Sequence, residues 1–270
     1  MRKSTLLLLM ALTLIACKKE EDVEVEDAAV VTVTFSDGSV SVDIPDEYAD
    51  YVTYSTSGAH LTLVQSESVD STTCGEIEYA IYGSTSNGSL TLEGSYKATI
   101  GLYGATITNP SGAALTINDG KRIKLSAKED TESTLVDGTG SQKACIECKG
   151  HLKLRGKGIL NVYANNLHGI WSKEYIEVKN ISLNIYSAQK DAINCSQYFY
   201  MKSGTIYLAG FLDDGVQVSK KENDDSEENT GNFTLEDGFM TINMNVSNDG
   251  KAVKVEGTAT GTDQITIISE

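Results

Sequence analysis

The chain has 270 residues, including 24 glycines and only two prolines, and its formal net charge is −16. This length is enough for one large domain, and the scarcity of proline suits sheets in which every strand donates its N–H groups to a neighbour. The negative charge argues against a nucleic-acid partner, whose binding depends on lysine and arginine. It is compatible with calcium, with neutral sugars, or simply with solubility.

The N-terminus has the features of a bacterial export signal. Arg2-Lys3 precedes an apolar stretch from Leu6 to Ala16, which is too short for a membrane-spanning helix. Residues 1–16 are therefore predicted to be a signal peptide. The segment 14–17, Leu-Ile-Ala-Cys, resembles a lipobox, which predicts lipidation of Cys17 and anchoring at the outer membrane or cell surface. A secretory signal with an incidental cysteine is the alternative.

Residues 17–28 are charged and poor in apolar side chains, which predicts an acidic tether. Its first residues, 18–22, read Lys-Lys-Glu-Glu-Asp and resemble the acidic export tag of bacterial surface lipoproteins. A solvated linker explains the same composition equally well.

Residues 29–64 are predicted to form an N-terminal β cap. Apolar and polar residues alternate on both sides of the turn-forming segment 36–39, which is typical of a hairpin. The end units of repeat proteins usually differ from the others, so this hairpin is expected to precede the repeats. The alternating apolar residues are Val31, Val33, Phe35, Val40, Val42 and Ile44.

Residues 65–270 repeat short apolar patterns at a step of 23 residues. Val162, Ile185 and Leu208 keep this step, and so do the triplets that begin at His168, Asp191 and Asp214. A fixed period in the twenties with strand-like alternation indicates a solenoid. The fold class predicted here is all-β, a parallel β-helix with three strands and about 23 residues per coil. Two interruptions are expected to be loops, one near residues 128–133 and the polar tract 220–228.

Four cysteines follow the predicted tether. Cys148 and Cys195 occupy equivalent inward positions two coils apart, about 9.6 Å at the usual strand spacing, which is too far for a disulfide. They are therefore predicted to be reduced core residues. Cys145 is expected to point outward, so the CxxC that it forms with Cys148 is a weak metal signal. Cys74 has no predicted place.

The bends at which two of the repeated triplets begin are acidic. Asp191 and Asp214 are equivalent in adjacent coils, and Asp213 lies beside the second. Stacked carboxylates repel one another unless something neutralises them. A calcium ion would do so, because it prefers carboxylate and carbonyl oxygens. These three residues are the predicted calcium ligands, and the alternative is that aspartate simply favours bends.

The outward side chains offer a surface for sugars. Tyrosine rings stack on sugar rings, and asparagine amides hydrogen-bond to hydroxyl groups. The alternative is that asparagine and tyrosine ladders stabilise the stacked sheet itself. The residues predicted to contact a polysaccharide are Tyr163, Tyr186, Tyr207, Asn161 and Asn184 on the third strands, and Trp171 on the first.

No catalytic motif is recognisable around the three histidines. Lys190, Arg155 and Lys251 are conceivable bases for a polysaccharide lyase, but nothing in the sequence singles one of them out. No catalytic residue is therefore assigned, and the protein is expected not to be an enzyme.

The bends at His168, Asp191 and Asp213-Asp214, together with the segments 107–115 and 134–138, resemble the bacterial carbohydrate-binding β-helix family. The resemblance implies a right-handed helix like that of pectate lyases and non-catalytic binding of plant-type polysaccharide, such as cellulose or acidic pectic polymers. It also implies calcium near Asp191, Asp213 and Asp214. His168 stands where an acid is expected, and Asp249 is displaced, so fewer calcium sites are expected. A calcium-dependent lyase and a structural or adhesive surface protein without a glycan ligand are the alternatives.

Overall fold

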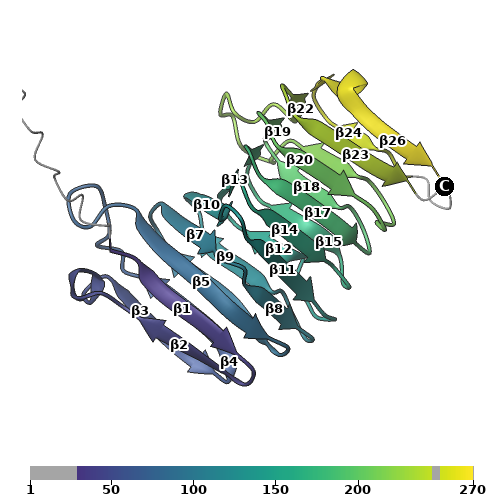
Figure 1. Cartoon of the computed structure of the whole chain (residues 1–270). Helices are drawn as coiled ribbons and strands as arrows, with labels where there is room; N and C mark the ends of the chain where they lie inside the picture. The colour runs from purple at the N-terminus through teal and green to yellow at the C-terminus, as the bar shows by residue number, and fades with distance from the viewer. Residues whose placement is uncertain (1–28, 245–249, 270) are drawn as a thin grey trace, which may run out of the picture.

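The computed structural model of the chain describes residues 29–244 and 250–269, and the structural statements below concern these residues. Nearly all of its regular structure is β, and the strands form a parallel β-solenoid of about eight turns. Figure 1 shows the coils stacked in one elongated column in chain order. The predicted all-β parallel β-helix is confirmed.

Each regular coil places one strand in each of three rows. The first row is a nine-stranded sheet, and the second and third rows are joined at β5 (Ile77–Thr85), which is long enough to pair with strands of both. The first row is β3 (Val52–Ser57), β4 (Ala59–Gln65), β6 (Gly88–Gly94), β9 (Leu115–Asp119), β12 (Ala144–Cys148), β15 (His168–Ser172), β18 (Ile193–Ser196), β21 (Val216–Ser219) and β24 (Val253–Val255).

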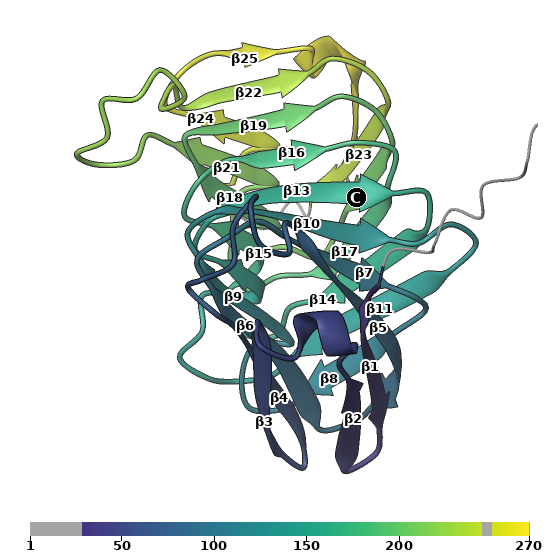
Figure 2. The ribbon, with the colours of Figure 1, turned by 90° about the vertical axis from the view of Figure 1, so that its left-hand side faces the viewer.

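The second row begins near the N-terminus, and the third row begins where the end of β5 pairs with β8 (Thr106–Asn109). The second row is β2 (Ser39–Asp43), β1 (Val31–Ser36), β5, β7 (Ala98–Leu102), β10 (Arg122–Ala127), β13 (His151–Gly156), β16 (Ile176–Val178), β19 (Tyr198–Met201), β22 (Asn232–Leu235) and β25 (Ala259–Thr260). In Figure 2 the second row faces the viewer, with β13, β16, β19, β22 and β25 one above another. The third row is β8 (Thr106–Asn109), β11 (Glu132–Asp137), β14 (Ile159–Tyr163), β17 (Ser182–Ser187), β20 (Thr205–Leu208), β23 (Phe239–Met244) and β26 (Ile265–Ser269). Two short 3-10 helices, η1 (Asp46–Tyr48) and η2 (Thr262–Gln264), lie near the two ends.

The strand register follows the repeat in the sequence. Leu160 pairs with Leu183, and Leu183 pairs with Ile206 in the next coil. Strand alternation turns these side chains inward, where all three are completely buried. Each aliphatic side chain buried in this way contributes about 1.5–3 kcal/mol of favourable transfer free energy. The 23-residue step therefore fixes both the backbone pairing and the filling of the core.

Two antiparallel hairpins stand at the N-terminal end of the column. The predicted hairpin is β1–β2, and a second one joins β3 to β4. β1 also pairs in parallel with β5, and β4 pairs in parallel with β6. The parallel stacking therefore starts before residue 65, the predicted start of the β-helix.

The prediction that Cys145 points outward is wrong. Its side chain is fully buried, as are those of Cys148 and Cys195, and all three are free thiols. Cys145 precedes the first regular inward position of β12, at a corner where the chain is still turning into the coil. Ala114 and Ala192 hold the equivalent position in other coils and are also buried, so this column takes small side chains inside the corner.

The eight extra residues predicted near residues 128–133 do not form one loop. The paired registers of β7 with β10, β8 with β11 and β9 with β12 show that the extra length is shared among the turns after β9, β10 and β11. A solenoid tolerates such additions at its corners because they leave the strand pairing unchanged.

Candidate functional site

The acidic bend predicted from the sequence is assembled in the structure. Asp191 and Asp214 lie at adjacent corners before β18 and β21, and both are almost completely buried. One carboxylate oxygen from each of Asp191, Asp213 and Asp214 lies within 4.8 Å of the others. The predicted group of three carboxylates is therefore present as a spatial cluster.

Basic residues flank this cluster along the same column. Strand register and backbone hydrogen bonds align His168, Asp191, Asp214 and Lys251 at equivalent positions in successive coils. The two buried aspartates therefore lie between positions held by histidine and lysine, and this order favours neutralisation of the carboxylates by the protein itself.

Each oxygen of the Asp191 carboxylate accepts a hydrogen bond. Oδ1 accepts from the Asp214 N–H at 3.1 Å, and Oδ2 accepts from Asn194 Nδ2 at 2.7 Å. His168 Nδ1 lies 3.3 Å from Oδ2. Burial alone would raise the pKa of Asp191, but the donors from His168, Asn194 and the Asp214 N–H outweigh it, and the pKa is lowered.

The Asp214 carboxylate is held in the same way. Oδ1 accepts from the Lys251 N–H at 2.9 Å, and Oδ2 forms an ion pair with Lys254 Nζ at 2.8 Å. Calcium needs six to eight oxygen ligands, and the four oxygens of Asp191 and Asp214 already have protein donors. The donor set as it stands does not fit a resident calcium ion. Calcium binding here stays a prediction that requires Lys254 to move away.

Three predicted tyrosines meet on the outer surface of the third row. The rings of Tyr163 and Tyr186 stack with centroids 5.1 Å apart, and Tyr207 lies 6.0 Å from Tyr186 at a tilt of 56°. We call these three residues the tyrosine ladder. Tyr163 pairs with Ser187 rather than Tyr186, because a bulge shifts the register between β14 and β17. Tyr163 and Tyr186 are 38% and 39% exposed, so one side of the ladder faces solvent.

The other predicted sugar contacts have different surroundings. Asn161 is buried, its Nδ2 donates to Glu132 Oε1, and its Oδ1 accepts from Asn184 Nδ2 at 2.9 Å. These amides therefore hydrogen-bond along the stack. Trp171 lies on the first row, apart from the tyrosine ladder, and Lys143 Nζ covers one face of its ring at 4.0 Å.

A second aromatic stack, which the sequence reasoning missed, lies on the second row. His151, Tyr175 and Tyr198 stack with centroids 4.3 and 4.5 Å apart. The sequence did contain a signal for this stack, because His151, Tyr175 and Tyr198 are separated by about one repeat length. Tyr175 is only 6% exposed, and burial lowers the pKa of His151, so this stack is mainly part of the packed wall.

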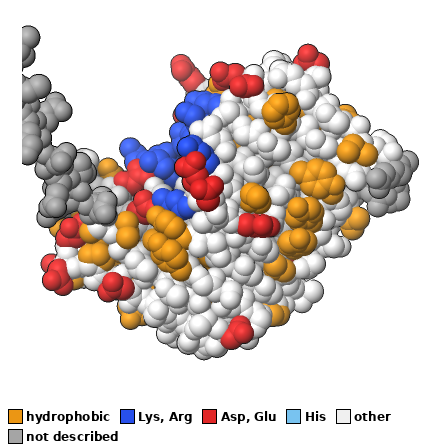
Figure 3. Space-filling model, in the orientation of Figure 1, with side chains coloured by type: hydrophobic (Ala, Val, Ile, Leu, Met, Phe, Trp, Pro, Cys, Tyr) orange, Lys and Arg blue, Asp and Glu red, His pale blue; other side chains and the backbone are white. Residues whose placement is uncertain are grey.

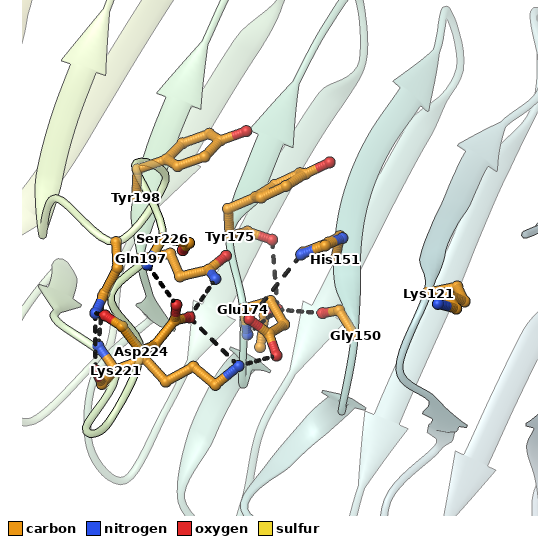
Figure 4. Close-up of polar contacts among 12 residues, drawn as sticks. Lys121, Gly150, His151, Glu174, Tyr175, Gln197, Tyr198, Lys221, Asp224 and Ser226 are labelled. Atoms are coloured by element: carbon orange, nitrogen blue, oxygen red, sulfur yellow. Dashed lines mark hydrogen bonds and ion pairs between the residues drawn. The ribbon is translucent and has the colours of Figure 1, made fainter. Parts of the chain in front are cut away.

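The polar tract 220–228 was predicted to be only an exposed loop, but it contacts preceding coils. Figure 4 shows Lys221 and Asp224 reaching toward Glu174 and Gln197. Lys221 Nζ lies 2.6 Å from Glu174 Oε1, and Gln197 Nε2 donates to Asp224 Oδ2 at 2.9 Å. Since these bonds join residues of three coils, they fasten the loop over the corner before β16 and β19.

The three possible lyase bases are not gathered at one site. Arg155 lies near the C-terminal end of β13 in the second row and pairs with Glu177 at 2.9 Å. Lys190 and Lys251 are exposed beside the acidic bend, where their backbones bond to Asp213 and Asp214. The geometry does not select any of the three as a base.

Comparison with known proteins agrees with this architecture. Residues 65–270 match the model of the family of carbohydrate-binding domain-containing proteins. The chain belongs to this family. A polysaccharide lyase-like protein from C. thermocellum, solved as a gadolinium derivative, is 18% identical and superimposes with a TM-score of 0.70. The match covers 89% of this chain and 100% of that protein and establishes a shared fold. A search among curated proteins gave no match.

The predicted membrane anchor cannot be placed on the fold. Cys17, the signal peptide and the tether lie outside the described residues. Within residues 29–244 and 250–269, no helix is long and apolar enough to cross a membrane.

Proposed function

We propose that the protein binds a polysaccharide without cleaving it, and that the tyrosine ladder is the contact surface. The observation that carries this proposal is the row of partly exposed rings formed by the stacked pair Tyr163 and Tyr186 and the tilted Tyr207. Membership of the carbohydrate-binding family supports binding of a carbohydrate as the general activity.

The chemistry of the ladder suits a linear glycan. Neighbouring coils are about 4.8 Å apart, so the rings follow the solenoid axis at a spacing comparable to one sugar residue. Because Tyr163 and Tyr186 stack on each other, a sugar would contact the ring surface that the stacking leaves exposed. The tyrosine hydroxyl groups both donate and accept hydrogen bonds. None of the three hydroxyls hydrogen-bonds to another described residue, so all of them are available to sugar hydroxyls.

The site of action proposed with this function is the outer membrane or cell surface. The support is the lipobox-like segment that ends at Cys17, which would carry the lipid anchor. A glycan-binding solenoid held there would retain polysaccharide at the surface. Retention of radiolabelled palmitate by the wild-type protein in cells, and its loss in Cys17→Ser, would test the anchor.

The test of glycan binding is a pull-down on insoluble polysaccharides, followed by titration with the polymer that retains the protein. The variant Tyr163→Ala/Tyr186→Ala should weaken binding about tenfold or more. Each aromatic contact contributes about 0.5–1.5 kcal/mol, and 1.4 kcal/mol corresponds to about tenfold.

Tyr54→Ala is the matched control. Tyr54 is 48% exposed on the edge strand β3, and it belongs to neither aromatic stack described above. Binding that survives in the ladder variant but not in the Tyr54 variant would contradict the proposal. Release of unsaturated sugar products during the incubation, measured by ultraviolet absorbance, would instead identify a lyase.

A further inference from the structure

We infer that the C-terminal end of the described solenoid is an interface for a second copy of this chain, which binds end against end about a two-fold axis. Residues 250–269, here called the terminal coil, form this end and contain β24, β25 and β26. The inference concerns the end of the column rather than its outer walls, so it does not rest on the tyrosine ladder or on glycan binding.

The strands of the terminal coil each have one unpaired edge. Among the described residues, β24 pairs only with β21, β25 only with β22, and β26 only with β23. Figure 1 shows β26 at the end of the column, and Figure 2 shows β25 at the end of the second row. The free edges present backbone N–H and C=O groups that can pair with another strand.

The hydrophobic core is also open at this end. Ile242 on β23 is completely buried, whereas Ile267, its partner on β26, is 55% exposed. On the first row, Val216 is buried and its partner Val253 is only half-buried. The inward positions of the terminal coil therefore leave apolar surface in water, and a second layer of side chains over them would be stabilising. On the face drawn in Figure 3, hydrophobic side chains continue to the C-terminal end of the column, while lysine and arginine gather in another part of it.

The terminal coil is electrically neutral in a strongly acidic chain. It contains two lysines, one glutamate and one aspartate, so its formal net charge is zero, although that of the whole chain is −16. The strand β26 has no charged residue, and Lys254 on β24 is already paired with Asp214. Repulsion between like charges opposes self-association of an acidic protein, and two copies that meet through this end bring two neutral surfaces together.

Other covers for the terminal coil fit less well. Residues 29–65, at the N-terminal end of the column, contain five acidic residues and no lysine or arginine, a formal net charge of −5. Their edge strand β3 exposes serine, threonine and one tyrosine. A head-to-tail contact would therefore place the apolar end against a polar, acidic one, and it would build filaments because it does not close. Residues 17–28 contain six acidic residues and would also be a poor cover.

The sequence of β26 suits pairing with its own copy. With the two-fold axis through the middle of this strand, Ile267 lies opposite Ile267 of the second copy, and Thr266 lies opposite Ile268. Strand alternation keeps Ile265 and Ile267 inward, so the core continues across the contact, while Thr266 and Ile268 meet on the outer surface. Such cross-strand pairs of β-branched side chains stabilise antiparallel sheets. The same rotation brings β24 of each copy against β25 of the other.

The contact is small for an interface. It offers 20 residues from each copy, and stable interfaces use about 20–30 residues on each side. We therefore expect a dimer that dissociates on dilution. The net charge of −16 on each copy opposes association and salt screens this repulsion, so the dimer should become tighter as the salt concentration rises.

Sedimentation equilibrium of the purified chain over a range of concentrations tests the inference. The mass should rise from that of one copy to that of two copies and no further. Ile267→Lys should weaken the dimer about tenfold or more, because the two-fold axis sets two lysines opposite each other. Phe239→Lys is the matched control. Phe239 is 77% exposed on β23, one coil away from the contact, so this variant also replaces an exposed apolar side chain and should dimerise like wild type.

A disulfide trap tests the two-fold arrangement without adding a charge. Ile267→Cys should give a covalent dimer on mild oxidation, because residue 267 lies opposite its own copy, and Phe239→Cys should not. The wild-type chain gives the background from its own cysteines. Four results would overturn the inference. These are the mass of one copy at every concentration, growth beyond two copies, equal dimerisation of wild type and Ile267→Lys, and no covalent dimer of Ile267→Cys above the background.

Discussion

Replacing Lys254 by methionine should destabilise the protein and increase its response to calcium. The ammonium group of Lys254 is the counter-ion of Asp214, whose side chain is only 2% exposed. A hydrogen bond to a charged group contributes about 1.5–3 kcal/mol, and the 46% exposure of Lys254 lowers this to about 1–2 kcal/mol. For a domain of this size the melting temperature should fall by about 2–8 °C.

Differential scanning calorimetry in chelator measures this fall, and Lys251→Met is the matched control. Lys251 contacts Asp214 through its backbone N–H, which the substitution retains, so this variant should melt like wild type. Added calcium should raise the melting temperature more in Lys254→Met than in wild type, because the substitution frees Asp214 Oδ2. Equal melting temperatures of Lys254→Met and wild type in chelator would refute the reasoning that Lys254 neutralises the buried carboxylate.

Two further predictions concern titratable groups elsewhere on the fold. Burial raises the pKa of Glu76, but hydrogen bonds from Arg122, Thr99 and Lys124 outweigh it and lower the pKa to about 2. The stability from these bonds is complete above pH 4.5, the ordinary pKa of a glutamate, and is lost as the pH falls toward about 2. The stability of Glu76→Gln should therefore fall less steeply than that of wild type in this pH range. Identical acid-unfolding curves for the two proteins would contradict this prediction. Burial also raises the pKa of Cys148 to about 12, which keeps its thiol unreactive. After treatment of the native protein with a thiol reagent, peptide mass spectrometry should show Cys74 modified. Cys145, Cys148 and Cys195 should be modified only after unfolding.

The repeat in the sequence was sufficient to predict the solenoid and the interior of its coils. Leu160, Leu183 and Ile206 are paired and buried as their spacing predicts, because the backbone ladder and the core impose the same period. The direction of side chains at the corners is less strictly set by the repeat. The inward turn that buries Cys145 depends on how the chain enters β12, and strand alternation does not describe that turn.

Electrostatic pairing was the least predictable feature of the candidate sites. The stacking of Asp191 and Asp214 could be read from the period, but their neutralisation could not. Lys254 reaches Asp214 only after the longer connection between β21 and β22, so the pair does not follow the regular step. The steps from Arg155 to Lys179 to Lys202 were also visible in the sequence. Only the structure distinguishes Lys179 and Lys202, which have no ion-pair partner among the described residues, from Arg155, which pairs with Glu177.

The most direct test of the central claim is a crystal structure of the protein with an oligosaccharide of the polymer that it retains in the pull-down. Our account predicts intact sugar residues along the solenoid axis, packed against the exposed rings of Tyr163 and Tyr186 and extending toward Tyr207. An oligosaccharide bound on another face with the tyrosine ladder uncovered, or a cleaved product at any site, would contradict it.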